Sequence, residues 1–193
     1  EDFVVPPLVL VGLIAFGAPL TFPYGITESM VSLSLSVAAR MGGVLVAEGV
    51  ILFVYSAIKK RKQKTGIWIW PMLFLVLKAI MQLIAAVSPA GLWLSEHGIR
   101  ILYLHVLLLG AFSIGAFAYL MEGLNIAKSY FYLIVFAVIT LIFSLLFMTS
   151  FWPESLSGIW IYPAMAIIAT IPIFAATILW AKLFMVNRKR QNL

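Results

Sequence analysis

The stretch RILYLHVLLLGAFSIGAFAYL, residues 100–120, decides the fold class of this chain. Apart from Arg100 and His105, it contains no side chain that ionises near neutral pH. A helix needs about 20 predominantly apolar residues to cross the hydrocarbon layer of a bilayer. The stretch therefore predicts a transmembrane helix, and it raises the question of what its single imidazole does.

The composition extends this interpretation to the whole chain. Of the 193 residues, 64% are apolar and 10% are charged, and the mean hydropathy is +1.11. Soluble domains carry about 25% charged residues, so we expect an integral membrane protein. The net charge of +6 comes from basic residues that gather at the ends of apolar segments, as membrane insertion selects, and we expect no nucleic-acid binding. The absence of cysteine excludes disulfides, thiolate zinc sites and iron–sulfur clusters bound by this chain.

Short polar breaks divide the chain into six apolar segments. No ten-residue alternation typical of membrane β-strands is visible, so the fold class is predicted as an all-α integral membrane bundle. Residues 1–193 form a single transmembrane helical domain, and two origins stay open for a chain that begins at Glu1: upstream residues were removed, or it is a fragment or half of a larger bundle. The six expected transmembrane helices lie near 4–20, 32–57, 67–88, 99–121, 129–151 and 159–185.

The basic residues predict the orientation, because Lys and Arg in short loops stay on the cytoplasmic side. One topology places ten of the 13 basic residues inside, with both termini cytoplasmic, in a bacterial inner membrane. The remaining loops carry Glu28, Glu96 and Glu154 and no lysine. The ten residues are Lys59, Lys60, Arg61, Lys62, Lys64, Lys128, Lys182, Arg188, Lys189 and Arg190.

Two opposite charges inside the apolar spans are expected at similar depth. At about 1.5 Å per residue, Glu48 lies roughly 13 Å and Lys78 roughly 16 Å above the inner ends of their segments. Charged groups in a membrane are costly unless they are paired or face a cavity. Two interpretations stay open: a buried Glu48–Lys78 ion pair, or a proton path through both groups.

A second polar level is expected nearer the outer face. Arg40, Gln82 and His105 lie about 9–12 Å below the outer ends of three different segments, and Arg100 and Tyr103 lie near a helix mouth. These groups either satisfy one another inside the bundle or line a site for a ligand. In the first case we expect His105 to hydrogen-bond Gln82 or a nearby carbonyl. In the second, Gly110 would make room for a flat ligand.

Motifs of common enzyme classes are absent from the sequence. It has no HExxH, no Walker loop and no GxSxG. With one intramembrane histidine, the chain alone cannot build a multi-histidine copper or di-haem site. Whether it is an enzyme therefore stays open.

The stretches FLVLKAIMQLIAAVSP (74–89) and GIRILYLHVLLLGAFSIGAFAYL (98–120) carry a family resemblance. They resemble the later half of multi-spanning Bacteroidota proteins that are distant relatives of haem–copper oxidase subunit I. The resemblance spans residues 74–120, about a quarter of the chain, and the matching residues are Lys78, Gln82, Arg100, Tyr103, Leu104, His105 and Gly110. It implies half of, or a companion to, such a bundle, with His105 as a ligand to a haem iron.

The sequence also departs from that superfamily, because paired histidines, copper ligands and the cross-linked tyrosine have no counterpart. Two functions follow as hypotheses. One is a subunit of a respiratory-chain complex with other membrane subunits, linked to electron transport, which binds haem or lines a quinol or proton site. His105, Gln82 and Tyr103 would then contact the cofactor, while Arg40 or Arg100 neutralises anionic groups. The other is a non-catalytic structural subunit or small transporter without a cofactor.

Overall fold

The computed structural model describes residues 7–21, 32–60, 66–88, 97–124 and 127–191, and in this part of the chain the only regular elements are helices. The fold class is therefore confirmed as all-helical. Five helices are long and apolar enough to cross a membrane: Leu33–Lys59, Ile69–Val87, His97–Gly123, Lys128–Met148 and Ile161–Lys182.

The helices follow the expected segments to within a few residues at most ends. They are α1 (Pro7–Leu20), α2 (Leu33–Lys60), α3 (Ile69–Val87), α5 (His97–His105), α6 (Ile114–Leu124), α7 (Lys128–Leu145) and α8 (Ile161–Gln191). The segment expected at 129–151 ends earlier, because a short 3₁₀ turn, η4 (Leu146–Met148), closes α7. A second 3₁₀ turn, η5 (Glu154–Leu156), lies in the connection to α8.

The first helix is shorter than a membrane span requires. In the described residues α1 has 14 residues, which corresponds to about 21 Å, whereas a bilayer core is about 30 Å thick. Its role as a sixth membrane span therefore stays a prediction.

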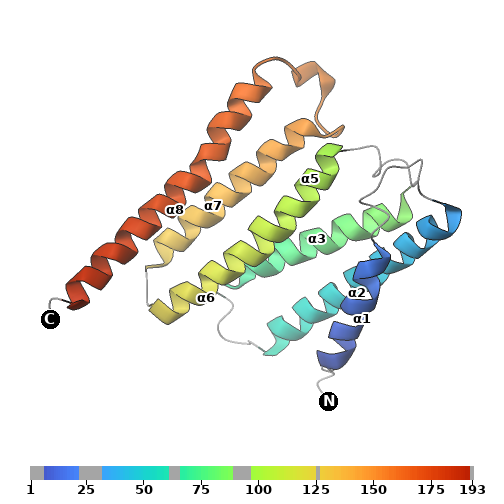
Figure 1. Ribbon diagram of the computed structural model, residues 1–193, viewed down its shortest axis with the longest axis horizontal. Helices are drawn as coiled ribbons and strands as arrows, with labels where there is room; N and C mark the ends of the chain where they lie inside the picture. The colour runs from blue at the N-terminus through green and yellow to red at the C-terminus, as the bar shows by residue number, and fades with distance from the viewer. Residues whose placement is uncertain (1–6, 22–31, 61–65, 89–96, 125–126, 192–193) are drawn as a thin grey trace.

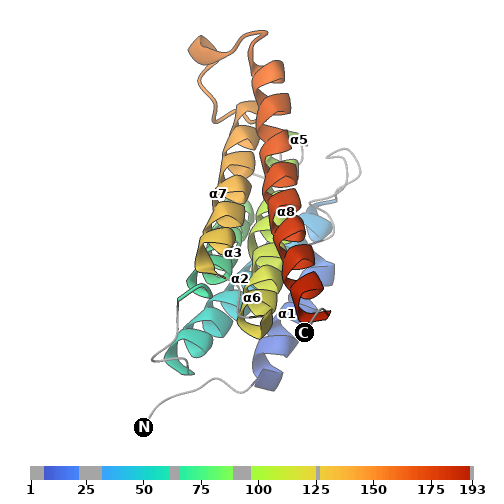
Figure 2. The ribbon, with the colours of Figure 1, turned by 90° about the vertical axis from the view of Figure 1, so that its left-hand side faces the viewer.

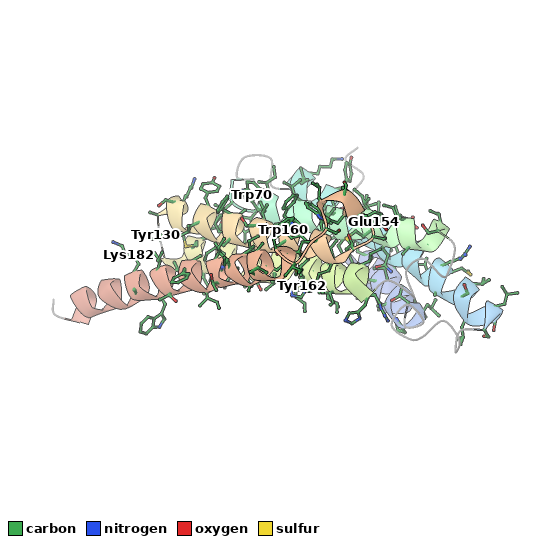
Figure 3. The ribbon with its side chains drawn as sticks, turned by 90° about the horizontal axis from the view of Figure 1, so that it is seen from above. Trp70, Tyr130, Glu154, Trp160, Tyr162 and Lys182 are labelled. Atoms are coloured by element: carbon green, nitrogen blue, oxygen red, sulfur yellow. The ribbon has the colours of Figure 1, made fainter. Side chains whose placement is uncertain are left out.

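The helices stand side by side in a row (Figure 1). α1 packs on α2, α2 on α3, and α7 on α8, while α5 and its continuation lie between α3 and α7. The start of α1 and the end of α8 point to the same end of the bundle (Figure 2). Figure 3 shows Lys182 and Tyr130 toward one end and Glu154 toward the other.

Small residues set the distance between α1 and α2. A Cβ built on Gly17 would lie 2.8 Å from the Gly42 carbonyl oxygen, and one on Gly49 would lie 2.9 Å from Ile14 Cγ1. Glycine allows this contact because membrane helices approach closely only where side chains are small. The α2 glycines thus place α1 on one face of α2.

The helix that carries His105 changes its geometry directly after that residue. Val106–Ser113 (η3) is π-helical and joins α5 to α6. Ser113 Oγ donates a hydrogen bond to the Leu108 carbonyl oxygen, five residues back, at 2.9 Å. Such wider turns are uncommon and frequently occur at functional sites, which draws attention to the residues around His105.

Candidate functional site: a polar cluster between α3 and α5

Two polar side chains of α3 are buried on the same face. Lys78 is 6% and Gln82 is 4% exposed. They are four residues apart, so they stack one helical turn from each other. Burial of such groups requires partners, because an unpaired polar group in an apolar interior is costly.

Tyr103 of α5 supplies a partner for both side chains. Its hydroxyl donates a hydrogen bond to Gln82 Oε1. The Lys78 ammonium lies over the Tyr103 ring, 5.6 Å from the centroid, within the range of a cation–π interaction. Lys78, Gln82 and Tyr103 form what we call the α3–α5 cluster.

α2 lies against the third side of this cluster. A Cβ built on Gly43 would lie 3.6 Å from Gln82 Nε2 and 3.3 Å from Ala86 Cβ. Ala47, one turn further along α2, is fully buried in a second apolar group that also contains Ala79 of α3. The cluster therefore lies where three helices meet.

Arg100 lies three residues before Tyr103 and so shares its side of α5. Its Nε atom is buried and has no hydrogen-bond partner among the described residues, although the residue as a whole is only half-buried. This nitrogen is therefore enclosed by the protein and is not open to a ligand in this structure.

His105 points away from the cluster. It follows Tyr103 by two residues, a rotation of about 200° around the helix axis. Its Nδ1 lies 2.8 Å from the Ile101 carbonyl oxygen. A carbonyl only accepts, so Nδ1 is the donor in this contact. In the neutral form of the ring, Nε2 then carries the lone pair. Of the two expected partners, the structure shows a nearby carbonyl and not Gln82.

The space expected beside Gly110 is filled. A Cβ built on Gly110 would lie 2.4 Å from Phe74 Cδ1, so the aromatic ring of α3 packs directly on the glycine backbone. Gly110 accommodates Phe74 in this structure rather than leaving room for a flat ligand.

Glu48 and Lys78 are not brought together. Lys78 is buried against Tyr103, whereas the Glu48 side chain is exposed on α2. No ion pair links the two in the described part of the chain. Arg40 is half-buried on α2, one turn before Gly43.

The residues expected around a haem do not form one pocket within this chain. The hydrogen bond from His105 Nδ1 to the Ile101 carbonyl oxygen is compatible with iron ligation through Nε2 of the neutral ring, since a ligating imidazole commonly donates its other N–H to a carbonyl. Tyr103 and Gln82, however, bind each other on the opposite flank, and Phe74 fills the space at Gly110. Nor does the described part of the chain hold a group of three or more His, Cys, Asp or Glu that could bind a metal ion.

One polar contact was not predicted. Trp68 Nε1 donates a hydrogen bond of 2.7 Å to Glu122 Oε1, and this bond joins the start of α3 to the end of α6. The sequence places both residues near the ends of apolar segments. It does not predict their pairing, because the pairing requires α3 and α6 to be neighbours.

Comparisons with protein-family models, with curated proteins and with solved structures give no match for this chain. Multiple long apolar helices are compatible with a multi-pass integral membrane protein.

Proposed function

We propose that this chain is a subunit of a larger integral membrane complex in the bacterial inner membrane, with six spans and both termini cytoplasmic. The observation that carries the proposal is Glu48, a carboxylate exposed near the middle of α2. A charged side chain at the centre of a membrane helix costs about 2.5–3.5 kcal/mol when lipid surrounds it. Contact with another polypeptide removes that cost.

The α3–α5 cluster supports a structural role for the interior. Tyr103 satisfies both Gln82 and Lys78, so these groups hold two helices together without a substrate. Buried polar groups that pair with one another are a recognised means of fixing how membrane helices pack.

The mass of the natively extracted protein tests this proposal. Extraction into lipid nanodiscs without detergent should give a particle that contains the 21.4 kDa chain together with other polypeptides in fixed stoichiometry. Isolation of the chain alone, from membranes in which other complexes stay intact, would refute the subunit role.

Cysteine labelling tests the topology. Single cysteines at Gln63 and Gln191 should react with an impermeant thiol reagent only from the cytoplasmic side, and one at Ser95 only from outside. The chain has no natural cysteine, so each label reports a single position. The opposite labelling pattern would mean that the bundle has the reverse orientation in the membrane.

A redox-linked, respiratory-type role is the second candidate, and it is favoured by the hydrogen bond between His105 Nδ1 and the Ile101 carbonyl oxygen. A bound haem would supply one-electron transfer. His105 would hold the iron through Nε2, and most of the pocket would come from another subunit. A quinol or proton site lined by Arg100, Tyr103 and Gln82 is the corresponding alternative without iron.

A spectrum decides the haem question. The reduced-minus-oxidised difference spectrum of the native complex should show a haem band that His105→Ala abolishes. His97→Ala, which removes the chain's other histidine, is the matched control and should retain the band. A folded native complex without any haem signal would refute haem binding.

A further inference from the structure

The outward face of α2 carries a regular line of exposed residues. Their spacings alternate between four and three, which is the heptad spacing of helices that pack side by side. The apolar members range from 40% exposed for Ile51 to 61% for Met41. We call this line the α2 seam; it consists of Val37, Met41, Val44, Glu48, Ile51, Tyr55 and Ile58.

The other faces of α2 are already covered within the chain. Gly42 and Gly49 contact α1, and Gly43 contacts α3. The seam is the remaining face, and all seven of its members are exposed in the described structure. Val, Ile and Met side chains on such a face are equally suited to contact lipid, so the exposed apolar residues alone do not identify an occupant.

Glu48 indicates what kind of molecule covers the seam, because this carboxylate is the central member of an otherwise uncharged line. It lies 15 residues after Leu33 and 12 residues before Lys60, which corresponds to about 22 Å and about 18 Å along the helix axis. The carboxylate is thus near the bilayer midplane, too deep to reach either surface. A carboxylate at this depth stays charged only where the occupant of the seam brings a group that compensates the charge.

Within the residues that the structure describes, a second copy of this chain offers no exposed cation at that depth. Two seams that pack in parallel would place one Glu48 against the other, and like charges at this distance repel. The exposed cations Lys128 and Lys182 lie at the start of α7 and near the end of the α8 span, far from the midplane.

We infer that the α2 seam docks a transmembrane helix of a different polypeptide, and that this helix carries a Lys or Arg at its midpoint that pairs with Glu48. The inference rests on the proposed role as a subunit and adds the docking face and the chemistry of the partner. Val44 and Ile51 would pack on either side of the ion pair and exclude lipid from it, because residues one turn apart share a face.

Photocross-linking in intact membranes tests the docking face. p-Benzoylphenylalanine at Val44 or Ile51 should cross-link to one polypeptide. The same residue at Ile173 or Phe174, which are 65% and 66% exposed on α8, is the matched control and should give lipid adducts only. Peptide sequencing should place the seam cross-links in a transmembrane segment with a central Lys or Arg.

Glu48 variants test the charge. In the Val44 cross-linker background, Glu48→Leu should reduce the yield by at least about tenfold, because it leaves the partner's cation buried without a counter-charge. Glu48→Asp should retain most of the yield. Charge reversal of the identified Lys or Arg together with Glu48→Lys should restore it.

Three outcomes would overturn the inference. They are lipid adducts alone at Val44 and Ile51, cross-links to a second copy of this chain, and a partner segment without a basic residue. If the native particle still contains other subunits, only the assignment of the seam fails. If the chain also isolates alone, the proposed subunit role fails with it.

Discussion

Lys78 and Glu48 are both charged residues near the middle of a long apolar helix, yet the fold treats them differently. Lys78 is nine residues from each end of α3 and lies inside the bundle against the Tyr103 ring. Glu48 lies at the corresponding depth of α2 but on its exposed face. The chain itself places an aromatic ring against the first charge, whereas our proposal assigns the second charge to a partner helix. Depth alone therefore does not tell which charges pair with each other.

The largest effect is expected from removing the partner of Lys78. Tyr103→Leu deletes the ring beneath the ammonium and the hydroxyl that binds Gln82. It should lower the free energy of unfolding in mixed micelles by about 3–5 kcal/mol, since a buried charge loses its compensation. Adding Lys78→Met should recover most of that loss.

Tyr119 provides the control, because it belongs to the same continuous helix and is 71% exposed. Tyr119→Leu should change the unfolding free energy by less than about 0.5 kcal/mol. Equal losses for the two tyrosines would mean that Lys78 is compensated in some other way.

A smaller effect should follow from crowding the contact between α3 and the π-helical segment. Gly110→Ala places a methyl group against Phe74 and should destabilise the protein by about 1–3 kcal/mol. Gly123→Ala, where a Cβ meets nothing within 4 Å, should be neutral or stabilising by up to about 1 kcal/mol. A neutral Gly110→Ala would mean that Phe74 packs less closely on Gly110 than described. In that case, adding Phe74→Leu to Gly110→Ala should not raise the free energy of unfolding.

The smallest effect is the coupling between the two charges. In a double-mutant cycle of Glu48→Gln and Lys78→Met, the two changes in unfolding free energy should add to within about 0.5 kcal/mol, as they do for residues without a shared contact. A coupling well above 1 kcal/mol would restore the buried ion pair as an interpretation and would remove the need for an external partner at Glu48.

Much of the site could be predicted along each helix and little of it across helices. The four-residue spacing of Lys78 and Gln82 correctly places both on one face of α3. The two-residue spacing of Tyr103 and His105 also implies that they lie on different sides of the helix. Grouping the polar residues by depth alone does not take this rotation into account. The sequence does not identify the contact of Tyr103 with Gln82: the shared depth of Gln82 and His105 favours these two as partners, whereas Tyr103 is placed only near a helix mouth.

By itself, the sequence determines that this chain forms long apolar helices and roughly where each begins and ends, because the length of an apolar run and its polar breaks are local properties. Only the tertiary structure decides which flank of each helix meets a neighbour. That choice depends on where glycines such as Gly42, Gly43 and Gly110 let backbones or rings approach, and each of these contacts involves a residue from a different helix. The burial of Lys78 and the exposure of Glu48 follow from this packing and not from the charge of either residue.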